Sequence, residues 1–207
     1  MEREVLFSGV GGQGIQLAAQ ALARAAALEG REVTLFGVYG GTMRGGSTDS
    51  TVVVGDTPIQ AAPIVSRAWS AVVMNTRYWE PGAKQGAGMA RKLVDGGLVL
   101  LNSSLADEGR PDASRFEVVE LPATEIAARA GRELAQTMVM LGAFARVTGV
   151  VALASLVDGM RQSLPDYRRQ HAAANEEMMH AGYDVEGLPS IPFWVATPAA
   201  SGTRTAS

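Results

Sequence analysis

The feature that most constrains this chain is a glycine-rich turn between a strand-like run and a helix-like run. Glu4–Ser8 has the composition of a strand, and Ile15–Glu29 repeats Leu, Ala and Ile at helical spacing. The turn between them reads G-V-G-G-Q-G, and its candidate binding residues are Gly9, Gly11, Gly12, Gln13 and Gly14. In a strand–turn–helix unit such glycines permit a sharp turn, and the helix start offers free N–H groups to an anion. The segment therefore predicts an anion-binding loop or, as the plainer interpretation, a tight connection only.

A second glycine-rich segment, Gly37–Gly46, follows the next predicted strand, Glu32–Phe36. Its candidate binding residues are Tyr39, Thr42, Met43, Arg44, Gly45 and Gly46. Glycines expose backbone amides as an anion-binding concavity, and an arginine among them suits bidentate bonding to phosphate or carboxylate. An ion pair between Arg44 and an acid of another chain is an equally good interpretation.

A helix separates the first two predicted strands, so we expect them to be parallel neighbours. Both glycine segments then open at the carboxyl edge of the sheet, where ligands and partners collect in open α/β folds. Further strands are predicted at Ser50–Val54, Ala71–Asn75, Leu98–Asn102 and Phe116–Glu120, with a helix around Gln85–Val94. Short apolar runs separated by helices indicate a three-layer α/β sandwich whose Rossmann-like sheet is mainly parallel and covered on both faces.

The second half of the chain is predicted to be helical from Ala123 to Ala181, with Thr124 as a helix cap. Gly149 interrupts this region, and Pro165 begins a final helix that ends at Gly182. We expect one domain over residues 1–187, followed by an irregular tail, 188–207. This tail wraps a partner through Phe193 and Trp194 or stays disordered.

Composition narrows the chemistry of this chain. It has 207 residues and no cysteine, which excludes thiolate-held iron–sulfur clusters, cysteine zinc sites and a thiol nucleophile. A net charge of −3 argues against a broad nucleic-acid surface. The two histidines, His171 and His180, are nine residues apart on a predicted helix and form a poor metal pair. We expect no metal site, no self-sufficient catalytic group, no membrane span and a cytoplasmic location.

An autonomous NAD(P)-dependent reductase is disfavoured, although Gly9, Gly11 and Gly14 match G-x-G-x-x-G. Such a site needs an acid for the ribose after the second strand, and this chain has Phe36-Gly37-Val38 there.

The two glycine segments in this order resemble the gamma subunit of the 2-oxoacid:ferredoxin oxidoreductases. The similarity includes Asn75, L-P-A-T-E-I-A at 121–127, M-V-M-L-G-A at 138–143 and the final helix, so it spans roughly residues 4–183. The chain departs from the family pattern at Gly41, Thr42 and Thr137, which leaves the 2-oxoacid open.

The resemblance implies a non-catalytic subunit of an enzyme complex. Such complexes decarboxylate a 2-oxoacid oxidatively to an acyl-CoA. Thiamine diphosphate, Mg²⁺ and [4Fe–4S] clusters are expected on partner chains, and ferredoxin or another acceptor takes the electrons. This chain would complete the assembly and help shape the coenzyme A path, with Gly11–Gly14 and Thr42–Gly46 at that interface. The alternative is a free-standing nucleotide-binding or regulatory module.

Overall fold

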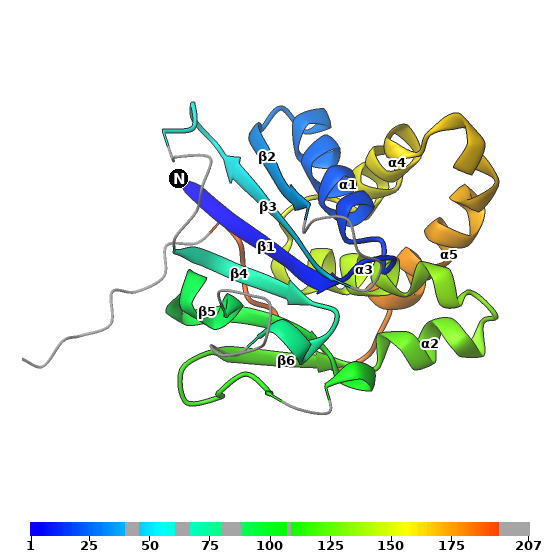
Figure 1. Ribbon diagram of the computed structural model, residues 1–207. Helices are drawn as coiled ribbons and strands as arrows, with labels where there is room; N and C mark the ends of the chain where they lie inside the picture. The colour runs from blue at the N-terminus through cyan, green and yellow to red at the C-terminus, as the bar shows by residue number, and fades with distance from the viewer. Residues whose placement is uncertain (40–45, 61–66, 80–87, 107–108, 195–207) are drawn as a thin grey trace, which may run out of the picture.

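The computed structural model describes residues 1–39, 46–60, 67–79, 88–106 and 109–194 (Figure 1). Its sheet has six strands in the order β2-β3-β1-β4-β5-β6. The strands are β1 (Glu2–Val10), β2 (Glu32–Tyr39), β3 (Ser47–Gly55), β4 (Ala68–Val73), β5 (Leu93–Asn102) and β6 (Glu117–Leu121). The α-helices are α1 (Ile15–Leu28), α2 (Ala123–Arg129), α3 (Gln136–Thr148), α4 (Leu153–Ser163) and α5 (Ala172–Tyr183). Short 3₁₀ helices are η1 (Thr76–Tyr78), η2 (Met89–Lys92), η3 (Ser103–Leu105), η4 (Glu133–Ala135) and η5 (Asp166–His171).

The sheet is mixed but mainly parallel, which confirms the predicted α/β class. β1, β4, β5 and β6 pair in parallel, and β3 pairs antiparallel with both β1 and β2. The expectation that β1 and β2 are neighbours is wrong, because β3 returns between them: Ser47 pairs with Val10, and Thr48 pairs with Tyr39. Two antiparallel pairings keep β1 and β2 in the same direction. Their carboxyl ends therefore still meet at one edge, as predicted.

One face of the sheet is covered by α-helices. α1 and α3 contact the strands, α4 packs on α1, and α5 packs on α3 (Figure 1). α1 ends as predicted, with Gly30 at φ +76° just beyond its last turn. The alanines on the inner side of α1 are fully buried, because small side chains let α4 approach closely. The final helix is shorter than predicted: Pro165 precedes the 3₁₀ helix η5, and α5 begins at Ala172.

The other face carries a smaller hydrophobic cluster that takes none of its described residues from an α-helix. Trp79 and Phe116 meet edge to face there, with ring centroids 5.7 Å apart. The helix predicted around Gln85–Val94 is wrong where the structure describes it. Met89–Lys92 forms a 3₁₀ turn, and β5 already begins at Leu93. At the Gly96–Gly97 pair, β5 shifts its register against β4 and continues as a strand. The apolar residues Leu93 and Val94, which precede this pair, therefore belong to β5 and not to a helix.

Beyond α5 the chain crosses the helical layer and packs against its own domain. The N–H groups of Ile191 and Phe193 donate to the carbonyls of Val147 and Thr148, at 2.8 and 2.7 Å. Phe193 is fully buried and lies edge to face with Trp69 at 5.0 Å. The expectation that Phe193 reaches a partner is therefore wrong, because its ring completes the core of this chain. No helix or strand is present in 188–194, and the predicted boundary at 187 stays a prediction.

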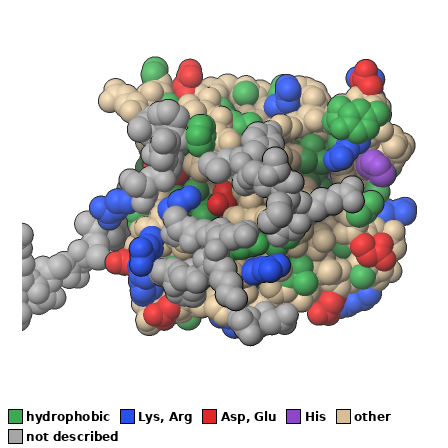
Figure 2. Space-filling view, viewed as in Figure 1, with side chains coloured by type: hydrophobic (Ala, Val, Ile, Leu, Met, Phe, Trp, Pro, Cys, Tyr) green, Lys and Arg blue, Asp and Glu red, His purple; other side chains and the backbone are tan. Residues whose placement is uncertain are grey.

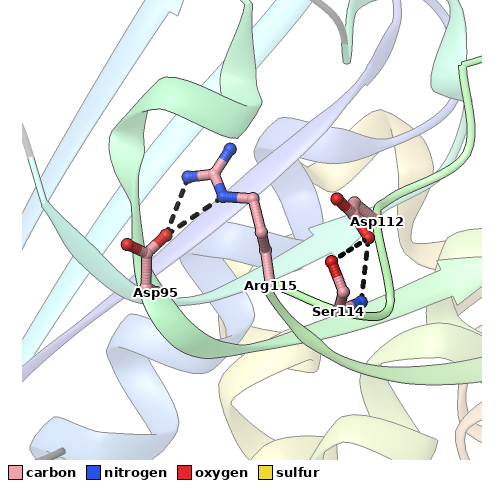
Figure 3. Close-up of polar contacts among 4 residues, drawn as sticks. All are labelled: Asp95, Asp112, Ser114 and Arg115. Atoms are coloured by element: carbon pink, nitrogen blue, oxygen red, sulfur yellow. Dashed lines mark hydrogen bonds and ion pairs between the residues drawn. The ribbon is translucent and has the colours of Figure 1, made fainter.

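The amino edge of the sheet carries ordinary surface contacts. Arg115, just before β6, holds Asp95 of β5 through Nε and Nη2 at 3.1 and 2.8 Å (Figure 3). Asp112 accepts hydrogen bonds from the Ser114 hydroxyl and amide, and these bonds lower the pKa of its carboxyl (Figure 3). Among the described residues, the face in Figure 2 intersperses basic, acidic and hydrophobic side chains. None of the described helices is long and apolar enough to span a bilayer.

Candidate functional site

The first glycine segment forms a compact loop between β1 and α1. Gly12 and Gly14 have φ values of +102° and +81°, which glycine adopts readily and other residues adopt only under strain. Gln13 closes the loop: its N–H donates to the Val10 carbonyl at 3.1 Å, and its side-chain oxygen accepts from the Val10 N–H at 2.7 Å. Gly14 is the N-cap residue of α1 and has no side chain to bond the first amides of the helix. The first turn of α1 therefore keeps N–H groups that can donate hydrogen bonds to an anion.

The two glycine segments meet at the carboxyl edge. The Gly11 N–H donates to the Gly46 carbonyl at 2.9 Å, just before Ser47 begins β3. Tyr39 ends β2, and its backbone pairs with Thr48 one residue further along β3. Thr42, Met43, Arg44 and Gly45 lie outside the described residues. The described ends of both segments are thus adjacent, as the sequence predicts.

A cleft of about 690 Å³ opens beside the first glycine loop. One wall consists of the loop, the start of α1 and Thr48 of β3. The opposite wall comes from the α2–α3 connection and from the segment that joins α4 to α5; it includes Gly131, Arg132, Glu133, Leu134, Arg168, His171 and Asn175. A cleft of this size suits a small organic ligand.

The charges of this cleft are unevenly shared between its walls. The glycine-loop wall contributes backbone amides and no ionisable side chain, whereas the opposite wall contributes Arg132, Arg168, His171 and one acid, Glu133. Arg132 donates through Nε to Glu177 at 3.0 Å, an exposed ion pair that balances part of its charge, whereas Arg168 forms no ion pair with another described residue. Arginines together with a helix N-terminus favour an anionic ligand.

A network of polar side chains joins the end of β5 to α2 and α3 beside the cleft. No sequence pattern predicts this network. Asn102 is fully buried at the end of β5, and its side-chain N–H groups donate to the Met74 carbonyl at 3.2 Å and the Thr124 hydroxyl at 2.9 Å. Thr124 in turn donates to the side-chain oxygen of Gln136 at 2.6 Å. Thr124 is therefore not the helix cap that we predict; Pro122 holds that position. Thr137, the next residue, donates its hydroxyl to the Gln13 carbonyl.

These residues and the α2–α3 wall of the cleft were not among the predicted site residues. They lie well outside the first glycine loop, from Asn102 onward in the chain, and contain no recognisable binding motif. The sequence offers two signals: Thr124 lies in the similarity at 121–127, and the departure at Thr137 marks a residue that contacts the glycine loop.

Asp49 is a half-buried acid in β3, next to the cleft residue Thr48. Its carboxylate accepts from the Ser8 hydroxyl at 3.0 Å, and its backbone carbonyl accepts from the Gln16 side chain at 3.3 Å. Burial raises the pKa of Asp49, against smaller lowering effects of the Ser8 hydrogen bond, the charge of Lys92 and the Ser47 hydrogen bond.

Within the described ranges, no three His, Asp or Glu side chains group as metal ligands, and both histidines are exposed.

Comparison with known proteins identifies the family. The family model described as pyruvate ferredoxin/flavodoxin oxidoreductase matches residues 4–185. The chain is 31% identical to the 2-oxoglutarate synthase subunit KorC of Methanocaldococcus jannaschii, over 80% of this chain and 85% of that protein. It is 32% identical to the pyruvate synthase subunit PorC of Methanothermobacter marburgensis, over 86% of this chain and 99% of that protein.

A solved structure has the same fold. The keto/oxoacid ferredoxin oxidoreductase gamma subunit of Geobacter sulfurreducens superimposes with a TM-score of 0.70 at 24% identity, over 88% of this chain and 95% of that one. The two relatives above are by name subunits of 2-oxoacid-converting enzymes, which favours the predicted complex over a free-standing nucleotide-binding module. The match to the family model, over residues 4–185, covers nearly all of the described fold. The chain belongs to the pyruvate ferredoxin/flavodoxin oxidoreductase family.

Proposed function

We propose that this chain is the gamma subunit of a multi-subunit 2-oxoacid:acceptor oxidoreductase and contributes no catalytic residue of its own. Support comes from relatives that are subunits of pyruvate and 2-oxoglutarate synthases and align over most of their length. The chain has no cysteine to ligate an iron–sulfur cluster. The [4Fe–4S] clusters therefore belong to partner chains in this proposal. It assigns the oxidative decarboxylation with thiamine diphosphate and Mg²⁺, and the contact with ferredoxin or another acceptor, to partner chains as well.

The role of this chain in the complex is to hold an anionic part of coenzyme A in the cleft. One observation carries this proposal: the N-terminus of α1 faces Arg132 and Arg168 from opposite walls of the cleft, whose volume is about 690 Å³. Coenzyme A carries a diphosphate and a further phosphate, and such groups bind to free helix amides and to arginine forks. Arg44, outside the described residues, is proposed to contact the same ligand from the second glycine segment.

The test is the kinetics of the assembled enzyme with Arg168→Ala in this chain. One lost arginine–phosphate contact worth about 1.4 kcal/mol raises the KM for coenzyme A about tenfold. The KM for the 2-oxoacid should not change, because its binding groups lie on other chains. Arg44→Ala is expected to raise the same KM or to lower turnover.

Arg169→Ala is the matched control for Arg168. Arg169 is in the same 3₁₀ helix and pairs with Asp166 at 2.8 Å, but it does not line the cleft. If the Arg168 and Arg169 variants have the same KM for coenzyme A as the unmodified enzyme, the cleft is not the coenzyme A site. If the chain does not co-purify with thiamine-binding and cluster-bearing subunits, the proposal of a complex is wrong.

A further inference from the structure

Two adjacent residues at the start of α3, Gln136 and Thr137, form hydrogen bonds in opposite directions at the carboxyl edge of the sheet. Thr137 donates its hydroxyl to the Gln13 carbonyl, which belongs to the first glycine loop. Gln136 accepts from Thr124, which is held by Asn102 at the end of β5. The start of α3 is thus bonded to the glycine loop in one direction and to the sheet in the other.

We propose that Thr137 is a positioning residue that fixes the first glycine loop, and with it the N-terminus of α1, in the geometry that faces the cleft. The consequence for ligand binding rests on the proposed function, but the effect on the loop does not.

The position of Thr137 explains why one hydroxyl has this effect. Its side chain is 1% exposed, and a Cβ placed on Gly14 would lie 3.9 Å from both its Cβ and its hydroxyl oxygen. Thr137 therefore lies directly beneath the residue that caps α1. The Gln13 side chain holds the other end of the loop through Val10. With the Thr137 bond removed, the Gln13 carbonyl loses its partner on the α3 side, and the peptide before Gly14 is free to rotate.

The network behind Thr137 keeps that contact in place. Asn102 donates to Thr124, and Thr124 donates to Gln136 at 2.6 Å. Side chains linked by successive hydrogen bonds in this way are restricted in the rotamers that they adopt. Gln136 is also the first residue of α3, directly after η4 on the opposite wall of the cleft. Thr137 thus links the glycine loop to the helix that directly follows the opposite wall.

The proposal is tested with Thr137→Val, which keeps the shape of the side chain and removes the hydroxyl. Thr137→Ser restores the hydroxyl and is the rescue variant. The matched control is Thr148→Val on the same helix, because Thr148 is also buried and donates its hydroxyl to Phe144 at 2.6 Å, far from the loop. The Thr148 hydroxyl also accepts from the Val150 N–H at 3.3 Å, so this control shows what the loss of a buried threonine hydroxyl does to α3 and the turn after it.

Two measurements are made on the assembled enzyme. Amide hydrogen exchange of the peptide covering residues 9–18 should become at least fivefold faster in Thr137→Val, and should match the unmodified protein in Thr137→Ser and Thr148→Val. The KM for coenzyme A should rise about tenfold in Thr137→Val alone, while kcat at saturating coenzyme A changes less than twofold.

The outcomes separate this proposal from the proposed function. Unchanged exchange of residues 9–18 in Thr137→Val overturns the positioning role, and the coenzyme A site then stands or falls with Arg168→Ala. Equal acceleration in Thr148→Val also overturns it, because the effect would then come from general loosening of α3. Faster exchange in Thr137→Val alone, with no change of KM in either Thr137→Val or Arg168→Ala, supports the positioning role and overturns the proposed coenzyme A site.

Discussion

At the crossing of α3 and α5, two glycines lie against the backbone of the facing helix, whereas Gly12 of the first loop lies in open space. A Cβ added to Gly142 would meet the Met179 carbonyl group, with its carbon 2.8 Å away, and one added to Gly182 would meet the Val139 carbonyl carbon at 2.7 Å. A Cβ on Gly12 would meet nothing within 4 Å.

The difference shows that glycine serves two purposes in this chain. At the crossing, the absent side chain allows the helices to approach, and the backbone there is ordinary helix. At Gly12 and Gly14 of the loop, the positive φ is what matters, and a Cβ there would have room. Close packing and ligand access thus depend on the same residue type for unrelated physical reasons. Substitutions by alanine should affect stability in the first region and ligand binding in the second.

Gly142→Ala should have the largest effect on stability. Its Cβ forces α3 and α5 apart along a fully buried contact, and overpacking of this kind costs about 3 kcal/mol. The free energy of unfolding from denaturant titration measures this loss. Gly149→Ala at the end of the same helix is the control. It has φ +60° and open space around it, so it should lose only about 1 kcal/mol. Equal losses in the two variants would contradict the close approach of α3 and α5.

Gly14→Ala should have a smaller effect on stability and a larger one on the ligand. Alanine at φ +81° costs about 1 kcal/mol, and the strained cap shifts the amides that face the cleft. We expect a severalfold higher KM for coenzyme A in the assembled enzyme. Gly30→Ala is matched to it, because Gly30 follows the other end of α1 at φ +76° in open space. An increased KM in both variants would mean that strain in α1, and not the cap geometry, controls the ligand.

Local features of this fold could be predicted from the sequence, because each depends on neighbouring residues. The strand, loop and helix around the first glycine segment, and the Gly30 cap, are in their predicted places. The pairing of β1 with β2 could not be predicted in this way. Strand neighbours are chosen by non-local contacts, and β3 follows β2 through a short connection and fits between the two strands.

The candidate site was predicted only on the side that has a motif. The glycine loop is a contiguous pattern with a known physical use, whereas the opposite wall consists of common residue types such as Arg132, Arg168 and Thr137. Their place beside the loop comes from the fold, which brings distant parts of the chain together. The same holds for Gly142 and Gly182, which are 40 positions apart and carry no local signal of their contact.

Substitution of Asp49 should have the smallest effect on stability, and it extends the comparison to the pH dependence of the free energy of unfolding. Burial raises the pKa of its carboxyl in the folded protein above the value of about 3.9 expected in the unfolded chain. Between those two pKa values the folded state binds more protons than the unfolded state. The free energy of unfolding therefore falls as pH rises through this window, upward from about pH 4, and then stays at the lower level. At the α3–α5 crossing, by contrast, the contacts between Gly142 and Met179 and between Gly182 and Val139 involve no ionisable group.

Asp49→Asn should remove the contribution of Asp49 and make the slope shallower, while burial also raises the pKa of Glu4 and leaves a contribution of the same sign. The amide keeps an oxygen for the Ser8 hydroxyl but does not ionise, so the variant should be more stable than the unmodified protein above the window and nearly equal to it below pH 4. Denaturant titrations from pH 3 to pH 8 measure both values. Asp95→Asn breaks an exposed ion pair at the amino edge and should change stability by less than about 1 kcal/mol (Figure 3). The same downward slope in Asp49→Asn as in the unmodified protein would show that another group carries the pH dependence, because an asparagine at position 49 has no proton to release in this range.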